Sequence, residues 1–537
     1  MIKKQLLNTL YYTVISTLIF ISGDILYSFY NSNYSFIPNK RNMVYPLILF
    51  LALSMISKSS LRIFIIVLIM TSTLIHLLYY QYFGNYIQPI AFIQFFQNTG
   101  EVFESFLPEF VSMLIPIVIA VFTTIALIFT AKKFHGRLIY FRFSSYVFFF
   151  LVVMHLGIIY SYLNNSTGKL NNVQSRFIYP RPNRHSFENF MRSLNYFSVG
   201  IVPKMISGDF EKFPETDTPI IIEHNPDKNI VLIIGESLRG DRLSILGYNE
   251  KTTPKLDSLY TAEPFIKKIV FAGGTMTQTA FTALINKSKY PGSGKQSISN
   301  VSNLFKLAKE NGFSTHFISK QSHSQLEIVV NLLSKQNIDF FAANSDLGKY
   351  ISDVSKYDSD LLPMLKEIDL NKSNFIVLQQ RGSHSPANNK YPDQYDKFKD
   401  PYDNSVLYTD HLISEVFKYL KENSLKETYL IFTSDHGELL GDIYGKKGHG
   451  WFEKGVLEVP YLFFAINNKD SVIYNQEKIK CHYDISTLMA GLLGYNAVIE
   501  DDFERTIYIN GSEINALAGY MVVRLNGDNV ISKEIIR

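Results

Sequence analysis

The chain has 537 residues, a length that favours two or more folding units. Apolar residues make up 47% and charged residues 19%, a composition that is too apolar for an ordinary soluble enzyme. The net charge of +4, with no dense basic stretch in the second half, gives little support to nucleic-acid binding. The single cysteine, Cys481, excludes an intrachain disulfide and leaves the cellular compartment open.

The long apolar runs all lie before about residue 165 and predict a transmembrane domain over 1–165. Five segments have the apolar character of a membrane span, the second being short: 8–29, 43–57, 61–83, 111–131 and 144–163. A cleaved signal peptide at the first segment is disfavoured because its core is long, no small-residue cleavage site follows, and four more spans do.

The charges of the loops indicate an orientation for these spans. With the N-terminus in the cytoplasm, the outside loops hold only Lys40 and Arg41. The inside segments hold Lys3, Lys4, Lys58, Arg62, Lys132, Lys133, Arg137 and Arg142. By the positive-inside rule, everything after the fifth span is expected to lie outside the cytoplasm.

Three ionisable residues, Asp24, His76 and His155, lie within or beside the spans. Such residues can mark function, or they can face the interface or a neighbouring helix. Residues 166–226 then form a polar, Pro-punctuated connecting segment. Its stretch 187–196 is amphipathic and predicts a helix, either on the membrane surface or packed on the soluble domain.

Residues 227–537 alternate short apolar runs with helical segments such as 301–310 and 405–422, which predicts an α/β domain with a mainly parallel sheet. The expected strands are 229–235, 268–271, 314–318, 374–378, 428–433 and 461–465. Sites in such sheets form where strands end, and several polar residues follow these strands closely.

Asp435 and His436 follow one predicted strand, and Glu236 follows another. Two carboxylates and one imidazole are oxygen and nitrogen ligands that suit Zn²⁺ or Mn²⁺ and leave a position open for substrate. His384 and His449 lie on glycine-bearing loops that can fold over this group. A satisfied core or surface position is the alternative for any one of these histidines.

A nucleophile is expected in the segment 272–286, where two glycines precede Thr275, Thr277 and Thr279. The paired glycines before a helix predict backbone N–H groups free to hold phosphate oxygens. A threonine bound to a divalent metal there can attack phosphorus. A plain helix N-cap is the alternative for these hydroxyls.

In these motifs the chain resembles the phosphoethanolamine transferases of Gram-negative bacteria, in the alkaline phosphatase/sulfatase superfamily. The resemblance covers five spans, a connecting segment and a catalytic domain. The motifs that carry it stand in the family's order: GESLRGDRLSILGYNEKTTPKLD (235–257), GGTMT (273–277), RGSHSP (381–386), YDNSVLYTDHLISEV (402–416), SDHGELLGDIYGKKGHG (434–450) and EVPYLFF (458–464).

The resemblance implies an N-terminal five-helix transmembrane bundle followed by an alkaline-phosphatase-like α/β/α domain. It also implies that Glu236, Thr277, Asp435 and His436 hold the catalytic metal, usually zinc, with Thr277 as the nucleophile. His384 and His449 would contact the phosphoryl group or a second metal and protonate the leaving group, and Asn303 would touch the headgroup. The implied donor is phosphatidylethanolamine, and the implied location is the bacterial inner membrane, with the catalytic domain in the periplasm.

Two departures leave the acceptor open among lipid A, a core sugar of the lipopolysaccharide, another glycan and a surface protein. The chain has one cysteine where lipid A-modifying members have several, and 280–282 reads Ala-Phe-Thr where the family usually has Ser-Val-Pro. A phosphoglycerol transferase is the alternative within the superfamily. A sulfatase would need a cysteine or serine in a formylglycine-type motif, and Cys481 stands elsewhere. A non-catalytic membrane sensor or scaffold is the alternative of another class.

Overall fold

The computed structural model describes residues 2–97, 110–139, 183–207, 213–214, 218–443, 445–468, 476–500 and 503–536. The predicted fifth span at 144–163 lies outside these residues. The chain divides into two compact units. Unit 1 comprises Met1–Asp209 and Leu440–Lys447, and unit 2 comprises Phe210–Leu439 and Gly448–Arg537.

The first four predicted spans are helices of unit 1: α1 (Ile2–Tyr30), α2 (Lys40–Ser54), α3 (Ser59–Phe83) and α6 (Phe110–Lys133). Among the described residues, α1, α3 and α6 are long and apolar enough to cross a membrane, whereas α2 is a shorter apolar helix. The other helices among the described residues of this unit are short: α4 (Ala91–Gln97), α9 (Ser186–Tyr196), a π-helical turn (Phe197–Ile201) and α10 (Val202–Ser207).

The helices of unit 1 pack as a bundle, with α1 against α2 and α6, and α3 against α6 and α9. Large apolar side chains such as Leu18, Leu68 and Phe122 remain exposed on the outside of this bundle. Exposed apolar side chains on apolar helices are what a lipid environment requires. Gly84 ends α3 in the left-handed conformation, with φ of 65°.

A buried polar network joins α1 to the start of α9. Asp24 Oδ2 lies 2.7 Å from His185 Nε2 and accepts the Ser186 hydroxyl at 3.0 Å. Its Oδ1 accepts the Ser186 backbone N–H at 3.0 Å and the Tyr34 hydroxyl. Among the described residues His76 is buried with neither ring nitrogen hydrogen-bonded, and His155 lies outside them. The predicted helix at 187–196 is therefore α9, anchored within unit 1.

Unit 2 is built on a seven-stranded sheet in the order β2-β9-β6-β1-β5-β3-β4. Its strands β1, β3, β4, β5 and β6 pair in parallel, and β9 is antiparallel to both β6 and β2. The strands are β1 (Lys228–Gly235), β2 (Ile266–Phe271), β3 (Ser314–Ser319), β4 (Phe340–Ala342), β5 (Asn374–Gln379), β6 (Glu427–Ser434) and β9 (Glu458–Ile466). All six predicted strands are present, and the predicted α/β class is confirmed.

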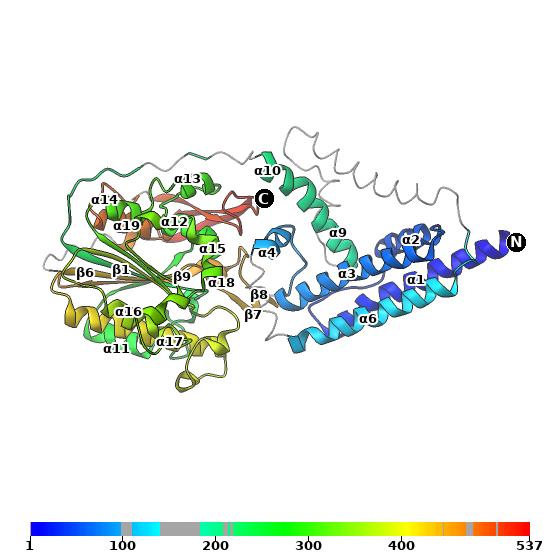
Figure 1. Cartoon of the computed structure of the whole chain (residues 1–537), viewed down its shortest axis with the longest axis horizontal. Helices are drawn as coiled ribbons and strands as arrows, with labels where there is room; N and C mark the ends of the chain where they lie inside the picture. The colour runs from blue at the N-terminus through cyan, green and yellow to red at the C-terminus, as the bar shows by residue number, and fades with distance from the viewer. Residues whose placement is uncertain are drawn as a thin grey trace. The chain divides into compact units, whose positions relative to one another are not determined.

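Helices cover both faces of this sheet (Figure 1). On one face lie α12 (Thr277–Leu284), α13 (Gly294–Ser299), α14 (Leu304–Glu310), α15 (His323–Val330) and α19 (His482–Leu492). On the other lie α11 (Pro254–Ala262), α16 (Leu361–Lys366) and α17 (Pro401–Asn423), and the short α18 (Lys454–Leu457) precedes β9. The residues 230–234 of β1 are fully buried between these layers. A strand buried on both faces needs a continuous apolar run, which is why β1 was predictable.

Two smaller sheets complete the described chain. β7 (Leu439–Ile443) and β8 (Lys446–Gly448) form one, and β10 (Glu504–Asn510), β11 (Tyr520–Asn526) and β12 (Asn529–Ile536) form an antiparallel one. The last residue of β10 braces the loop after β2. Asn510 donates its N–H to the Gly273 carbonyl at 3.0 Å and accepts the Thr275 N–H at 3.1 Å.

Candidate functional site

Four parallel strands deliver the candidate residues to one edge of the large sheet. Glu236 follows β1, and Asp435 with His436 follows β6. The loop to Thr277 leaves β2, and the loop to His384 leaves β5. Because these strands run in the same direction, their carboxyl ends meet at one edge, where open α/β sheets form their sites.

Glu236, Asp435 and His436 are buried and offer ligand atoms within 4.8 Å of one another. Thr277 joins them at the start of α12. Its Oγ1 donates to Asp435 Oδ2 at 2.6 Å and lies 3.4 Å from Glu236 Oε2 and 3.5 Å from His436 Nε2. The structure therefore brings together all four residues predicted to hold a metal.

The imidazole of His436 is oriented for metal binding. Its Nδ1 lies 2.9 Å from the Gly437 carbonyl, which can only accept, so the ring hydrogen is on Nδ1. The other ring nitrogen, Nε2, faces Glu236 Oε1 at 3.6 Å and Asp435 Oδ2 at 3.4 Å. Two buried carboxylates this close together are stabilised by a cation between them. The donor set fits a divalent metal ion, with the second ring nitrogen fixed by a carbonyl as metal-binding histidines usually are.

Two residues that the sequence analysis did not single out orient the carboxylates. Ser237 has a φ of 58°, which places its N–H 3.1 Å from Asp435 Oδ1 and its hydroxyl 3.1 Å from Glu236 Oε1. Gln321, after β3, places its Nε2 3.3 Å from Glu236 Oε2. The other oxygen of Asp435, Oδ2, accepts the Thr277 hydroxyl.

His384 and His449 lie together beside His436. The ring centroids of His384 and His449 are 5.3 Å apart, and those of His436 and His449 are 4.5 Å apart. The buried carboxylate of Glu438 holds the loop that carries His384, because its Oε2 accepts the Ser385 N–H at 3.0 Å. Burial raises the pKa of Glu438, and the nearby His384 opposes that shift.

The three threonine hydroxyls have distinct positions. That of Thr277 faces the carboxylates, that of Thr279 accepts the Met276 N–H at 3.2 Å, and that of Thr275 is buried without a partner among the described residues. The predicted phosphate-holding role of the glycine N–H groups is wrong for Gly273, because its N–H donates to His482 Nδ1 at 3.1 Å. Gly273 is glycine because a Cβ there would lie 2.4 Å from that of Ala283.

Asn303 is not brought to this group in a form that can bind a headgroup. It is buried at the start of α14, where its Oδ1 accepts the N–H groups of Phe305 and Lys306. Its Nδ2 donates to Asn286 Oδ1 at 2.9 Å and to the Leu332 carbonyl at 2.8 Å. Both lone pairs and both N–H groups are engaged, so the side chain caps a helix.

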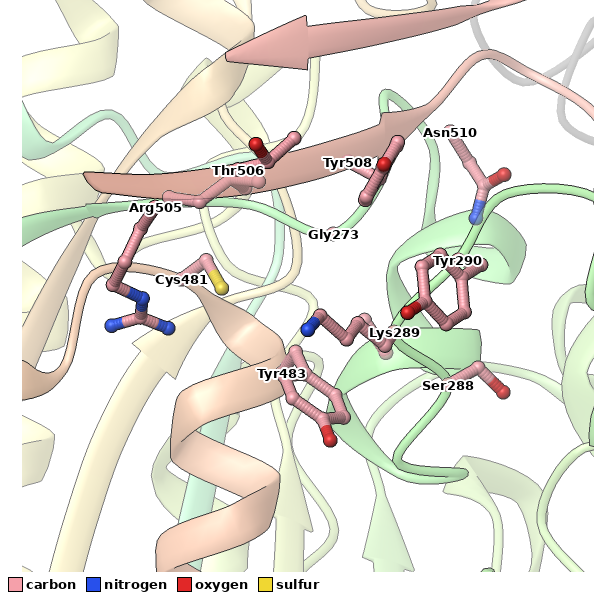
Figure 2. Close-up of a pocket in the computed structure, with 12 residues that line it drawn as sticks. Gly273, Ser288, Lys289, Tyr290, Cys481, Tyr483, Arg505, Thr506, Tyr508 and Asn510 are labelled. Atoms are coloured by element: carbon pink, nitrogen blue, oxygen red, sulfur yellow. The ribbon is translucent and has the colours of Figure 1, made fainter. Parts of the chain in front are cut away.

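A small pocket lies beside the loop that leads to Thr277, between α12, the start of α19 and β10 (Figure 2). Gly273 and Cys481 line it, together with the rings of Tyr290, Tyr483 and Tyr508. Lys289 also lines it and forms an ion pair with Glu500. The pocket does not include the predicted metal ligands.

Residues 228–495 match the sulfatase family. The chain carries a sulfatase-family domain. This sulfatase domain spans β1 through α19 and contains every predicted metal ligand. The predicted membership of the alkaline phosphatase/sulfatase superfamily is confirmed.

Relatives extend the similarity beyond the sulfatase domain. The phosphoethanolamine transferase EptC of Escherichia coli K12 is 22% identical over 437 residues, which cover 74% of this chain and 73% of that protein. The Kdo(2)-lipid A phosphoethanolamine 7''-transferase of Salmonella typhimurium is 27% identical over 235 residues, 40% of each chain. The predicted resemblance to phosphoethanolamine transferases is thus confirmed.

A solved structure matches nearly the whole fold. The integral membrane protein lipooligosaccharide phosphoethanolamine transferase A of Neisseria meningitidis covers 91% of this chain and 96% of its own, with a TM-score of 0.59 and 16% identity. The order of apolar helices first and sulfatase domain second is therefore shared. The predicted location, an inner-membrane protein with its catalytic domain in the periplasm, is confirmed at this level.

Proposed function

We propose that this chain transfers phosphoethanolamine from phosphatidylethanolamine to a hydroxyl of a cell-envelope acceptor. The acceptor is lipid A, the lipopolysaccharide core or another glycan. The observation that carries the proposal is the Thr277 hydroxyl, held 2.6 Å from Asp435 beside Glu236 and His436. The names of the relatives, which are phosphoethanolamine transferases, supply the group that is transferred.

Glu236, Thr277, Asp435 and His436 would hold the metal, which we propose to be Zn²⁺, with Mn²⁺ as the alternative. When bound, such an ion lowers the pKa of a coordinated hydroxyl and offsets the charge of phosphoryl oxygens. Thr277, once its hydroxyl proton has passed to solvent, attacks the phosphorus of the donor. The bond from Oγ1 to phosphorus forms as the bond from phosphorus to the diacylglycerol oxygen breaks.

His384 and His449 serve the two proton transfers. In the first half-reaction one of them gives its proton to the departing diacylglycerol oxygen. In the second half-reaction the acceptor hydroxyl attacks the phosphothreonine, loses its proton to that histidine, and the bond to Thr277 breaks. The histidine thus returns to its starting state. Because the donor is a lipid, the membrane helices raise its local concentration at the site.

Mass spectrometry of envelope lipids and glycans from cells that express the full chain tests this proposal. We expect one class of molecule to gain a phosphoethanolamine mass, and Thr277→Ala to abolish the gain. Thr275→Val is the matched control, because it removes an unpaired buried hydroxyl at nearly constant volume and should preserve the modification. A gain of a phosphoglycerol mass instead would show that the donor is not phosphatidylethanolamine. An active Thr277→Ala enzyme would refute the proposed nucleophile.

A further inference from the structure

His482, the first residue of α19, lies fully buried between two backbone segments of the site. Its Nδ1 accepts the Gly273 N–H at 3.1 Å, and its Nε2 lies 2.9 Å from the Ser434 carbonyl and, more distantly, 3.4 Å from the Thr433 hydroxyl oxygen. An N–H can only donate and a carbonyl can only accept. The ring is therefore neutral, with its hydrogen on Nε2, and both nitrogens are satisfied by backbone groups.

These two backbone groups belong to the two halves of the site. Gly273 precedes Thr277 by four residues on the loop after β2, and Ser434 directly precedes Asp435 and His436 at the end of β6. The strands β2 and β6 are not neighbours, because β9 lies between them. No ladder hydrogen bond can therefore join their ends, and the imidazole of His482 spans the gap.

The loop that contains Gly273 packs closely against the start of α19, where His482 lies. A Cβ on Gly273 would lie 3.5 Å from the Cβ of His482, so loop and helix are already in close approach. Figure 2 shows Gly273 facing the start of α19, where Cys481 and Tyr483 flank His482 in sequence. The opposite side of the loop is held by Asn510, which bonds the Gly273 carbonyl.

We propose that His482 is a positioning residue that fixes the Thr277 loop against the strand that presents Asp435 and His436. Only one measurement in its test, the formation of phosphothreonine, rests on the proposed function. Each of its two hydrogen bonds has a separate task. The bond to Gly273 sets the position of the nucleophile, and the bond to Ser434 sets the position of two metal ligands.

Two substitutions separate these tasks in the full-length protein purified in detergent. His482→Asn keeps an acceptor near the Nδ1 position, and His482→Gln keeps a donor near the Nε2 position. We expect His482→Asn to weaken Zn²⁺ binding about tenfold while phosphothreonine forms at the normal rate in saturating Zn²⁺. We expect His482→Gln to bind Zn²⁺ normally while phosphothreonine formation from phosphatidylethanolamine slows about tenfold. Competition with a fluorescent chelator and single-turnover labelling give the two values.

Hydrogen exchange of the metal-free protein supplies a readout that is independent of turnover. The peptide that contains Gly273 should exchange faster in His482→Gln than in His482→Asn. Ser486→Ala is the matched control, since that hydroxyl bonds only the Tyr483 carbonyl of its own helix and its loss should change none of the three readouts. His482→Phe keeps neither bond, so folded His482→Phe should show both weaker Zn²⁺ binding and slower phosphothreonine formation.

The proposal is overturned if the Asn and Gln variants lower thermal stability equally but match the wild type in Zn²⁺ affinity, turnover and exchange of the Gly273 peptide. If the wild-type enzyme itself forms no phosphothreonine from phosphatidylethanolamine, the proposed function fails. The Zn²⁺ affinities and the exchange rates still decide the role of His482 in that case.

Discussion

Gln321 contacts the predicted metal ligand Glu236 through its side-chain amide, which also contacts a backbone carbonyl. Its Nε2 lies 3.3 Å from Glu236 Oε2 and 3.3 Å from the Gln380 carbonyl. An amide N–H aimed at a ligand carboxylate fixes which oxygen faces the metal. The residue therefore acts on the site through Glu236.

We predict that Gln321→Leu lowers the affinity of the protein for Zn²⁺ by about 10–100-fold, because the substitution removes the donor that orients a ligand. Titration against a competing chelator measures this change. Gln325→Leu is the control, since Gln325 accepts the Ser322 N–H in the capping box of α15. That variant should lose about 1 kcal/mol of stability and no metal affinity. Equal affinities for Gln321→Leu and the wild type would contradict the prediction.

At the residue scale, the sequence was informative about the residues that follow strands in recognisable motifs. Glu236, Asp435 and His436 could be predicted because a ligand type directly follows an apolar run. The residues that support them could not. Glu438 follows His436 by two positions, yet only the fold shows its side chain bonded to Ser385. Asn303 failed for the same reason, since its hydrogen-bond partners come from other segments of the chain.

At the element scale, the strands β1, β5, β6 and β9 of the large sheet could be predicted because each is an apolar run that is buried almost throughout, whereas the three-residue β4 was not predicted. The strands β10–β12 could not be predicted from the sequence either. Most residues of β12 are exposed, and its sequence neither alternates polar with apolar residues nor forms a continuous apolar run, so it gives no clear strand signal. These strands matter to the site nonetheless, because β10 delivers Asn510 to the loop before Thr277.

The helix α9 shows the same limit, because its amphipathic pattern predicted a helix without naming its anchor. That anchor is Asp24, whose two oxygens receive Tyr34, His185 and Ser186. We predict that Asp24→Ala lowers the stability of unit 1 by about 3 kcal/mol, because it leaves three buried groups without their acceptor. Thermal unfolding in detergent measures the loss, and limited proteolysis near residues 183–196 should accelerate.

A control for this variant lies on α3. Thr71 is exposed and its hydroxyl bonds only the Val67 carbonyl within its own helix. Thr71→Ala should therefore leave both the melting temperature and the proteolysis rate near wild-type values. If Asp24→Ala behaves as Thr71→Ala does, the network is not the anchor of α9.

At the scale of the whole molecule, acidification should destabilise the protein through His482. Burial lowers the pKa of His482 to about 4, whereas a histidine of the unfolded chain titrates near 6.5. Between these values the unfolded chain binds a proton that the folded protein does not. The stabilisation is therefore complete above about pH 6.5 and is lost as the pH falls toward 4, by about 3 kcal/mol in all.

We predict that the stability difference between the metal-free wild type and His482→Gln shrinks by this amount from pH 6.5 to 4. Thermal unfolding at a series of pH values measures it. The comparison also cancels Asp410, whose pKa burial raises to about 7 and whose stabilising effect is lost as the pH rises. A difference that stays constant with pH would show that His482 is not held neutral.

The buried thiol beside His482 allows local opening of this segment to be measured in solution. The chain has a single sulfur nucleophile, Cys481, which is buried immediately before His482. Burial raises the pKa of its thiol, so the reactive thiolate is scarce while the segment stays closed. The rate at which an added reagent alkylates Cys481 then measures how often the start of α19 opens locally. Labelling of this one thiol in the native protein therefore reports the movement that would separate Thr277 from Asp435 and His436.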